Sequence, residues 1–316
     1  MIGLSVVYVV AGVVFSAFAI LSALDRNNRK RFGNAAFWAL VATSFLAGDR
    51  LGDVGNGIVV LGLAAIAGLG GLGRGLPATT STDERKTSAE RFGNRLFIPA
   101  LTLPLVVVFG VLVLKPLEFG GVPLLDPKQA TLLSLSLAAV IATGVGLVLL
   151  RQPLMSPLQE GRRLMDTVGW AALLPQMLAA LGAVFALAGV GETIGQLVTT
   201  HLPMDARLTA VAVYCLGMAG FTMIMGNAFA AFPVMTAGVA LPILVGKFGG
   251  DPAVIASIGM LSGFCGTLMT PLAANFNLVP AALLELPDRY AVIRAQIPTA
   301  IPLLLANVVL MYVLAF

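Results

Sequence analysis

Long apolar segments without charged side chains recur along almost the whole chain. Nine such runs, uncharged or nearly so, cover residues 1–24, 32–48, 54–73, 96–114, 129–150, 167–191, 208–246, 252–284 and 295–316. Because a helix rises 1.5 Å per residue, about 20 apolar residues cross the hydrocarbon core of a membrane. Charged residues make up only 11% of the chain, well below the fraction in soluble domains. The sequence therefore predicts an all-α polytopic membrane protein with about eight spans.

The distribution of Lys and Arg predicts how these spans are oriented. With the N-terminus outside, the cytoplasmic segments hold fourteen of the 19 basic residues and the outer segments hold five. An excess of basic residues marks the cytoplasmic side. We therefore expect a multi-pass protein with both termini on the outer side of the membrane. Residues 74–95 are expected to form a flexible cytoplasmic connector, and residues 1–24 a retained first helix and not a removed signal.

The histidine and cysteine content argues against a catalytic or metal centre. Cys215 and Cys265 lie inside apolar runs and are expected to be buried core residues. His201 is the only histidine, and we expect it to lie in a solvated outer loop near Asp205, without a nucleophile and base around it. The sequence therefore predicts no enzymatic activity and no metal site. The net charge of +4 is read as a topology signal, and no nucleic acid is expected as a partner.

Two of the runs are too long for a single span. Residues 208–246 would extend about 58 Å as one helix and residues 252–284 about 50 Å. Helix-breaking residues lie near the middle of both runs, at Gly226, Asn227, Gly266, Thr267, Thr270 and Pro271. Since a threonine hydroxyl caps free amides and proline suits the first helical position, Thr270-Pro271 predicts a new helix start. We expect a re-entrant hairpin over 208–246 and a broken helix over 252–284. A short loop between two full spans remains the alternative at 226–227.

Interrupted helices inside a membrane are typical of solute-binding sites. Non-helical backbone is tolerated there only where protein or a polar cavity surrounds it. Helix starts then bind anions, and unwound carbonyls bind cations. The polar groups in the two runs are all neutral: Asn227, Thr236, Ser257, Ser262, Thr267, Thr270, Asn275 and Asn277. Neither run contains Asp, Glu or His, which favours Na⁺ over H⁺ as a coupling ion. The alternative is that these small polar residues serve only helix packing.

The segment "GNAFAAFPVMTAGVALPILVGKFGGDPAVIASIGMLSGFCGTLMTPLAANFNLVPAALLEL" (226–286) resembles a family of bacterial inner-membrane proteins. That family is catalogued as domain of unknown function 979 and described as one subunit of a 5-oxoproline (pyroglutamate) transporter. The resemblance runs the full length of the chain. It implies uptake of a small carboxylate and a second, smaller membrane subunit as partner.

The order of hairpin and broken helix is also similar to the ion transporter superfamily, in which substrate lies between two inverted repeats. Asn227 matches the polar hairpin tip, and Gly266-Thr267 and Thr270-Pro271, with Asn275, match the following break. Superfamily members hold two such units in one chain, but this sequence shows only one. The resemblance therefore implies half of an inverted repeat, completed by the partner subunit.

These observations combine into one expectation for the organisation of the chain. Residues 1–150 are expected to be scaffold helices and residues 151–316 a transport unit. The function expected is secondary, cation-coupled uptake of a small carboxylate, with no cofactor other than a coupling Na⁺; a non-transporting scaffold or assembly subunit is the alternative. The expected substrate-binding residues are Gly226, Asn227, Thr267, Thr270, Asn275 and Asn277. The expected cation-binding residues are Asn227, Ser262, Gly266 and Thr270.

Overall fold

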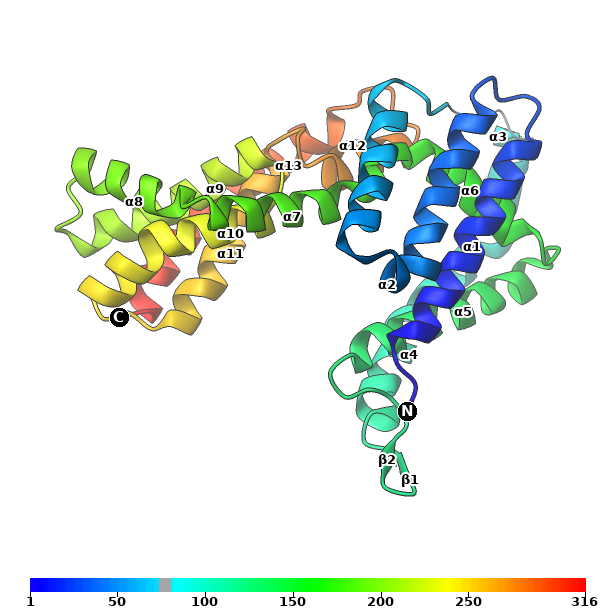
Figure 1. The fold of residues 1–316 in the computed structure, drawn as a ribbon, viewed down its shortest axis with the longest axis horizontal. Coiled ribbons are helices and arrows are strands. Elements are labelled where there is room, and N and C mark those ends of the chain that lie inside the picture. The colour runs from blue at the N-terminus through cyan, green and yellow to red at the C-terminus, as the bar shows by residue number, and fades with distance from the viewer. Residues whose placement is uncertain (74–80) are drawn as a thin grey trace. The chain divides into compact units, whose positions relative to one another are not determined.

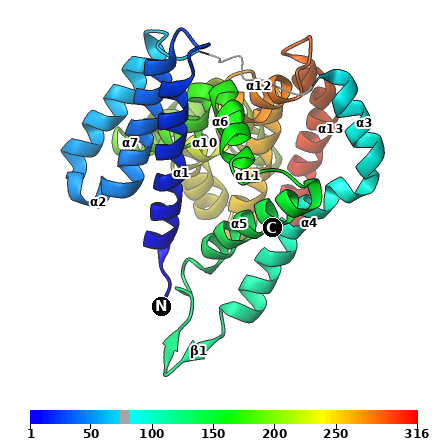
Figure 2. The same ribbon diagram turned by 90° about the vertical axis from the view of Figure 1, so that its right-hand side faces the viewer.

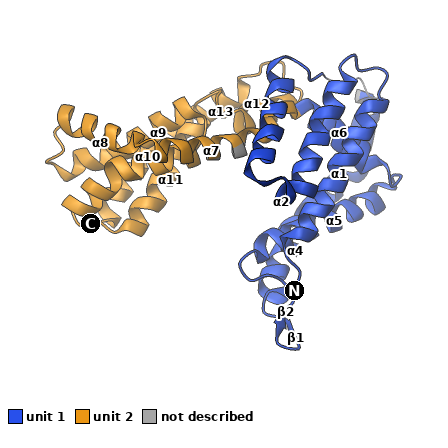
Figure 3. Cartoon of the chain, in the orientation of Figure 1, with its two compact units in different colours: residues 1–167 blue, residues 168–316 orange. Residues whose placement is uncertain are grey.

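The computed structural model describes residues 1–73 and 81–316 and is helical almost throughout (Figure 1). Among the described residues, seven helices are long and apolar enough to cross a membrane, or eight if one bent pair is a single span. This confirms the all-α polytopic membrane protein that the apolar runs predict. The chain divides into two compact units, Met1–Thr167 and Val168–Phe316 (Figure 3).

The described part of the first unit consists of the helices α1 to α6, two short η helices and a small β-hairpin. Its elements are α1 (Leu4–Leu24), α2 (Arg31–Gly68), α3 (Thr82–Phe92), η1 (Gly93–Leu96), α4 (Phe97–Phe109), η2 (Gly110–Leu114), β1 (Glu118–Phe119), β2 (Val122–Pro123), α5 (Ala130–Leu150) and α6 (Ser156–Val168). The N-terminus lies near the β1–β2 hairpin in both views (Figures 1 and 2), and the Ile2 amide donates to the Leu124 carbonyl.

Two helices make up α2, because the chain reverses at Gly52. This glycine has a φ of 63°, a left-handed value that other residues adopt with strain. After the reversal the chain returns to the start of α2, where the Asn34 side chain donates to the Gly73 carbonyl at 2.7 Å and accepts from the Gly73 amide at 2.9 Å. The runs 32–48 and 54–73 are therefore separate antiparallel helices joined by a tight turn.

The predicted flexible connector 74–95 is partly wrong. Residues 74–80 lie outside the described residues, but α3 occupies most of the remainder. The Ser81 hydroxyl accepts from the Glu84 amide, and the Glu84 carboxylate accepts from the Ser81 amide. This reciprocal pair is a capping box, which stabilises the first turn of a helix. The segment is polar because it is a solvated helix, and not because it lacks structure.

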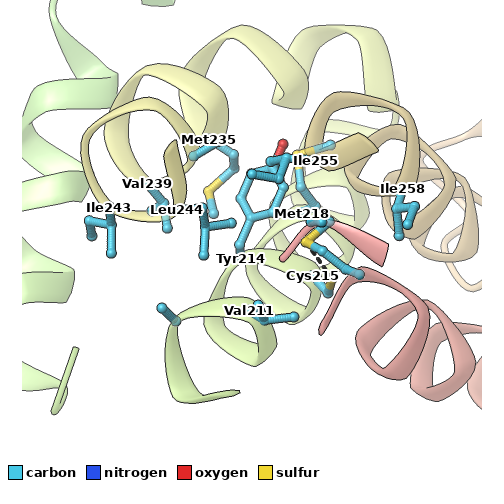
Figure 4. Packing of buried hydrophobic residues seen from close by; sticks show 14 of the residues in the cluster. Val211, Tyr214, Cys215, Met218, Met235, Val239, Ile243, Leu244, Ile255 and Ile258 are labelled. Carbon is cyan, nitrogen blue, oxygen red and sulfur yellow. Dashed lines mark hydrogen bonds between the residues drawn. The ribbon is translucent and has the colours of Figure 1, made fainter. Parts of the chain in front are cut away.

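The second unit is built around α9. Its elements are η3 (Gly169–Leu173), α7 (Leu174–Leu187), α8 (Val190–His201), α9 (Arg207–Met225), α10 (Ala228–Met235), the π-helical η4 (Thr236–Lys247), α11 (Pro252–Leu268), α12 (Ala274–Leu283) and α13 (Ala291–Leu314). Tyr214, Cys215 and Met218 of α9 are fully buried, and Figure 4 shows them among side chains of η4 and α11. Cys215 and Cys265 are both buried and free, as expected of core residues.

The run 167–191 does not form one straight span, and His201 does not lie in a loop. The helix α7 ends at Leu187, the chain turns at Gly189 with a φ of 69°, and α8 continues to His201. The helical segments on either side of this turn are inclined by 66°. His201 is the exposed last residue of α8. The error arises because Glu192 and the polar residues after it look like a surface loop.

Candidate functional site

The helices are interrupted at both predicted positions, and the two interruptions touch each other. The first is the turn at Gly226-Asn227 between α9 and α10, and the second is the non-helical segment 269–273 between α11 and α12. Arg207–Met225 and Ala228–Lys247 are each long enough to cross a membrane, which fits the alternative of a short turn between two full spans as well as a re-entrant hairpin. The Thr270 hydroxyl donates to the Met223 carbonyl at 2.9 Å. A methyl group added to Gly226 would lie 2.6 Å from the Leu272 carbonyl oxygen, so the two backbones are in contact there.

Four helix ends meet at this contact. Along their shared face, Gly259 of α11 lies against Tyr214 of α9, and Gly263 lies against Met218 and Thr222, so the two helices run in the same direction. Both end at the interruptions, where α10 and α12 begin. Helix C-termini carry partial negative charge and helix N-termini partial positive charge. The site therefore combines groups suited to a cation with groups suited to an anion.

The hairpin tip is built by its two central residues. Gly226 has a φ of 75° and ends α9, a position that favours glycine. Asn227 is the N-cap of α10, and its Oδ1 accepts from the Phe229 amide at 2.7 Å. Asn227 is only 5% exposed, and its side-chain NH₂ group makes no hydrogen bond to any described residue. That group remains available as a donor.

The prediction that Thr270-Pro271 starts the new helix is wrong. The helix α12 begins at Ala274, with Ala273 as its N-cap. The Thr270 hydroxyl stabilises the non-helical turn itself, because it accepts from the Leu272 amide at 3.2 Å while donating to Met223. A threonine–proline pair therefore marks the break but not the first helical residue.

Asn277 holds the broken segment together. Its side-chain NH₂ donates to the Thr267 and Thr270 carbonyls, both at 2.7 Å. The Thr267 carbonyl is in the last turn of α11 and the Thr270 carbonyl is in the non-helical segment after it, where helical partners are missing. The Oδ1 of Asn277 is buried without a partner among the described residues. Asn277 is thus fixed at one end and has a free acceptor at the other.

The other predicted site residues differ in how near they lie to the break. Thr267, near the end of α11, donates to the Phe264 carbonyl, and the half-buried Asn275 lies in the first turn of α12. Gly266 packs against the Ala219 carbonyl of α9. Ser262 lies farther back in α11 and donates to the Ile258 carbonyl at 2.9 Å. Ser262 and Gly266 are packing positions in this structure.

Thr222 is a buried polar residue near the site that the sequence did not single out. Its hydroxyl oxygen has no hydrogen-bond partner among the described residues, although the side chain is fully buried. It lies one turn before Gly226, next to Gly263 of α11. Its distance from the glycine–asparagine pair, one helical turn, was the signal that could have identified it.

The described residues of the two interruptions carry no charged side chain. The nearest charges along these helices belong to the opposite ends, where Lys247 donates to Asp205 at 2.7 Å and Asp251 caps α11. The hydrogen bond and charge of Lys247 lower the pKa of the Asp205 carboxyl. Among the described residues, no three His, Cys, Asp or Glu side chains are grouped as metal ligands.

A cavity of about 650 Å³ lies in the first unit. Its lining comes mainly from α1 and α5 and includes Val6, Val10, Phe18, Leu133, Leu137 and Val140. The three hydroxyl groups in the lining each donate to a carbonyl of their own helix, four residues earlier. The cavity is therefore apolar and shares no residue with the two interruptions.

The comparisons identify a family without assigning an activity. No curated protein and no solved structure matches the chain. A family model described as "Protein of unknown function (DUF979)" matches residues 5–316, which is nearly the whole chain. The chain therefore belongs to the DUF979 family of proteins of unknown function.

Proposed function

We propose that this chain is a subunit of a secondary transporter that takes up a small carboxylate. The observation that carries the proposal is the contact between two helix interruptions in a polytopic membrane protein. Backbone that leaves the helix inside a membrane protein is typical of transporter binding sites. The substrate, 5-oxoproline, and the smaller partner subunit are taken from the family resemblance described above.

Each half of the site has a role in this proposal. The starts of α10 and α12, with the free NH₂ of Asn227, bind the carboxylate, because amide donors and positive helix ends stabilise an anion. The ends of α9 and α11 bind a cation through oxygen atoms, among them the unpartnered Oδ1 of Asn277. Neutral oxygen ligands suit Na⁺, so the coupling ion proposed for this site is Na⁺ and not H⁺.

Uptake by reconstituted vesicles tests the proposal directly. Labelled 5-oxoproline is supplied to vesicles that contain this chain alone, or this chain with the smaller subunit, with and without a sodium gradient. We expect sodium-dependent uptake only with both subunits. Absence of uptake with both subunits present would refute the substrate, and uptake that ignores the gradient would refute sodium coupling.

Two substitutions at the interruptions test the location of the site. Asn227→Ala removes the free donor, and Thr270→Val removes the hydroxyl that joins the two interruptions. Losing the Asn227 hydrogen bond to a charged substrate costs about 1.5–3 kcal/mol, or roughly tenfold or more in uptake. Thr270→Val should also lower uptake, because it removes the hydrogen bond that holds the two interruptions together. Thr270→Ser keeps the hydroxyl and should retain uptake. Asn27→Ala, at an exposed residue of the first unit, is the matched asparagine control.

A scaffold or assembly subunit is the second candidate function. The observation that favours it is the number of site side chains that bond to their own chain, including Thr267, Thr270 and the NH₂ of Asn277. A scaffold would still purify with the smaller subunit. Its Asn227→Ala and Thr270→Val variants would then transport at the parent rate when equally abundant in the membrane.

A further inference from the structure

A buried charge cluster lies in the first unit, where α1, α2 and α6 come together. Arg162 of α6 donates through Nη1 to Asp25, the C-cap of α1, at 2.8 Å. The same Nη1 lies 4.0 Å from the Asp166 carboxylate, one turn farther along α6. The side chains of Arg162, Asp25 and Asp166 are 10%, 9% and 5% exposed. Buried ionisable groups in a membrane protein are rare and costly.

The three groups do not balance in charge. If both carboxyl groups are ionised, two negative charges share one guanidinium, and one negative charge remains uncompensated. The hydrogen-bonding capacity of the guanidinium is also not satisfied, because its Nε is buried without an acceptor among the described residues. An unpaired charge away from water is expensive, and a group in that position commonly changes its protonation state instead.

Asp166 has the weaker set of partners of the two carboxyl groups. Asp25 is bonded by the guanidinium and also accepts from the Asn27 amide. The hydrogen bonds to Asp166 come from neutral groups: the indole of Trp38, whose Nε1 donates at 2.8 Å, and the Asn34 side chain. Burial raises the pKa of the Asp166 carboxyl, and the Trp38 bond, the Arg162 charge and the Asn34 bond together lower it by less.

Four other charged residues near this cluster have contacts of their own, and Arg26 and Arg29, in the turn between α1 and α2, are exposed. Lys30, in the turn before α2, donates to the Gly70 carbonyl, and Arg31 lies over the ring of Phe32. On α6, Arg163 pairs with Glu160 at 2.7 Å and both are more exposed than Asp166. Arg162 and Asp25 are therefore the charged groups that act on Asp166, one attracting and one repelling its carboxylate.

We infer that Asp166 is a proton-binding site, in which one proton removes the excess negative charge of the Asp25–Arg162–Asp166 cluster. The site is independent of the interruptions at 226–227 and 269–273 and of the proposed transport function. It provides a carboxyl group in a chain whose two long interrupted runs contain no Asp, Glu or His. Asp166 lies three residues before Gly169, whose φ of 59° ends α6 where the chain passes into the second unit.

The fluorescence of Trp38 reports directly on this site. The chain has two tryptophans, so Trp170→Phe leaves Trp38, bonded to Asp166, as the single tryptophan, which is excited selectively over the tyrosines. Emission of the full-length Trp170→Phe protein in detergent is recorded as a function of pH. We expect one transition, with a midpoint above the ordinary value for an aspartate. Asp166→Asn, in the same background, should abolish it.

Two further variants keep the test decisive if Asp166→Asn fails to fold. Asp25→Asn removes the repelling charge and leaves Arg162 to Asp166 alone, so the midpoint should move to lower pH. Glu160→Gln, the exposed carboxyl on the same helix, should leave the midpoint unchanged. A flat emission profile in the folded protein would overturn the inference. So would a transition that persists in Asp166→Asn or ignores Asp25→Asn.

Discussion

Single residues at the interruptions show how a membrane protein stabilises unwound backbone. Asn277 uses both hydrogens of its NH₂ group to bind carbonyls that the end of α11 leaves free. The Thr270 hydroxyl donates to one carbonyl of α9 and accepts from one amide of its own turn. The sequence identifies these polar residues as unusual among apolar neighbours. It cannot predict which carbonyls they bind, because those lie 7 to 47 residues away.

Asn277→Asp should strongly destabilise the second unit. The change is nearly isosteric, but it replaces two donors by acceptors that face the Thr267 and Thr270 carbonyls. Leaving a buried polar group unsatisfied costs about 1–3 kcal/mol. Thermal unfolding in detergent should show a clear loss of stability. Asn275→Asp, at a half-buried residue without a hydrogen bond to the described residues, should cost much less; equal losses would contradict the role given to Asn277.

Gly226→Ala separates backbone strain from contact between the interruptions. The added methyl group is strained by the positive φ and also meets the Leu272 carbonyl. Gly249 has a similar φ of 70° but nothing within 4 Å of the same position. Gly249→Ala therefore loses stability only through backbone strain, by about 1 kcal/mol. We expect Gly226→Ala to lower the unfolding temperature more than Gly249→Ala, and a smaller or equal effect would argue against the contact.

The raised pKa of Asp166 predicts the sign of a pH effect on stability. A carboxyl that binds its proton more tightly when folded stabilises the protein at low pH. This contribution is lost as the pH rises from the ordinary aspartate value through the raised value. Unfolding temperatures of the parent should therefore fall over that window relative to those of Asp166→Asn. A difference that grows in the opposite direction would show that burial is not the dominant effect.

Among the elements, α8 is a helix that the sequence did not predict. Its apolar residues Val190, Ile194, Leu197 and Val198 follow helical spacing, but the polar residues between them suggest a loop. The helix is held by backbone contact, since Gly191 and Gly195 lie against Gly238 of η4. The broken helix was easier to predict, because its length exceeds one span and breaking residues lie near its centre. The bend at Gly189 has no such excess of length.

Gly238→Val should separate α8 from η4. A side chain at this position meets the backbone of Gly191 and Gly195, which cannot move without shifting α8. Overpacking of this kind costs about 1–3 kcal/mol. Limited proteolysis should then cut the segment between α7 and α9 sooner than in the parent. Gly220→Val, in α9, where nothing lies within 4 Å, is the matched control and should leave the cleavage rate unchanged.

At the scale of the whole molecule, composition predicts the fold class but not the division into units. The apolar runs account for the spans, and the second unit buries more of them: the segment Ala228–Lys247 is more buried than any other candidate span. A sequence shows which segments are apolar. It does not show which of them face protein and which face lipid, because both environments favour the same residues.

The orientation predicted from basic residues is testable by cysteine labelling. The two native cysteines are buried, so the background reaction should be low. In intact cells, an impermeant maleimide should label Glu118→Cys in the β-hairpin but not Glu90→Cys in α3 until the cells are opened. Both parent residues are exposed. The reverse pattern would place the N-terminus in the cytoplasm.

The bond between Thr270 and Met223 has a mechanical consequence. It links the segment that follows α11 to the last turn of α9, and the close contact between Gly226 and Leu272 lies at the same place. The hairpin tip and the broken helix cannot move apart without breaking the hydrogen bond between Thr270 and Met223. In the proposed transporter, a movement that exposes the solute must therefore displace both segments together or first break the hydrogen bond of Thr270.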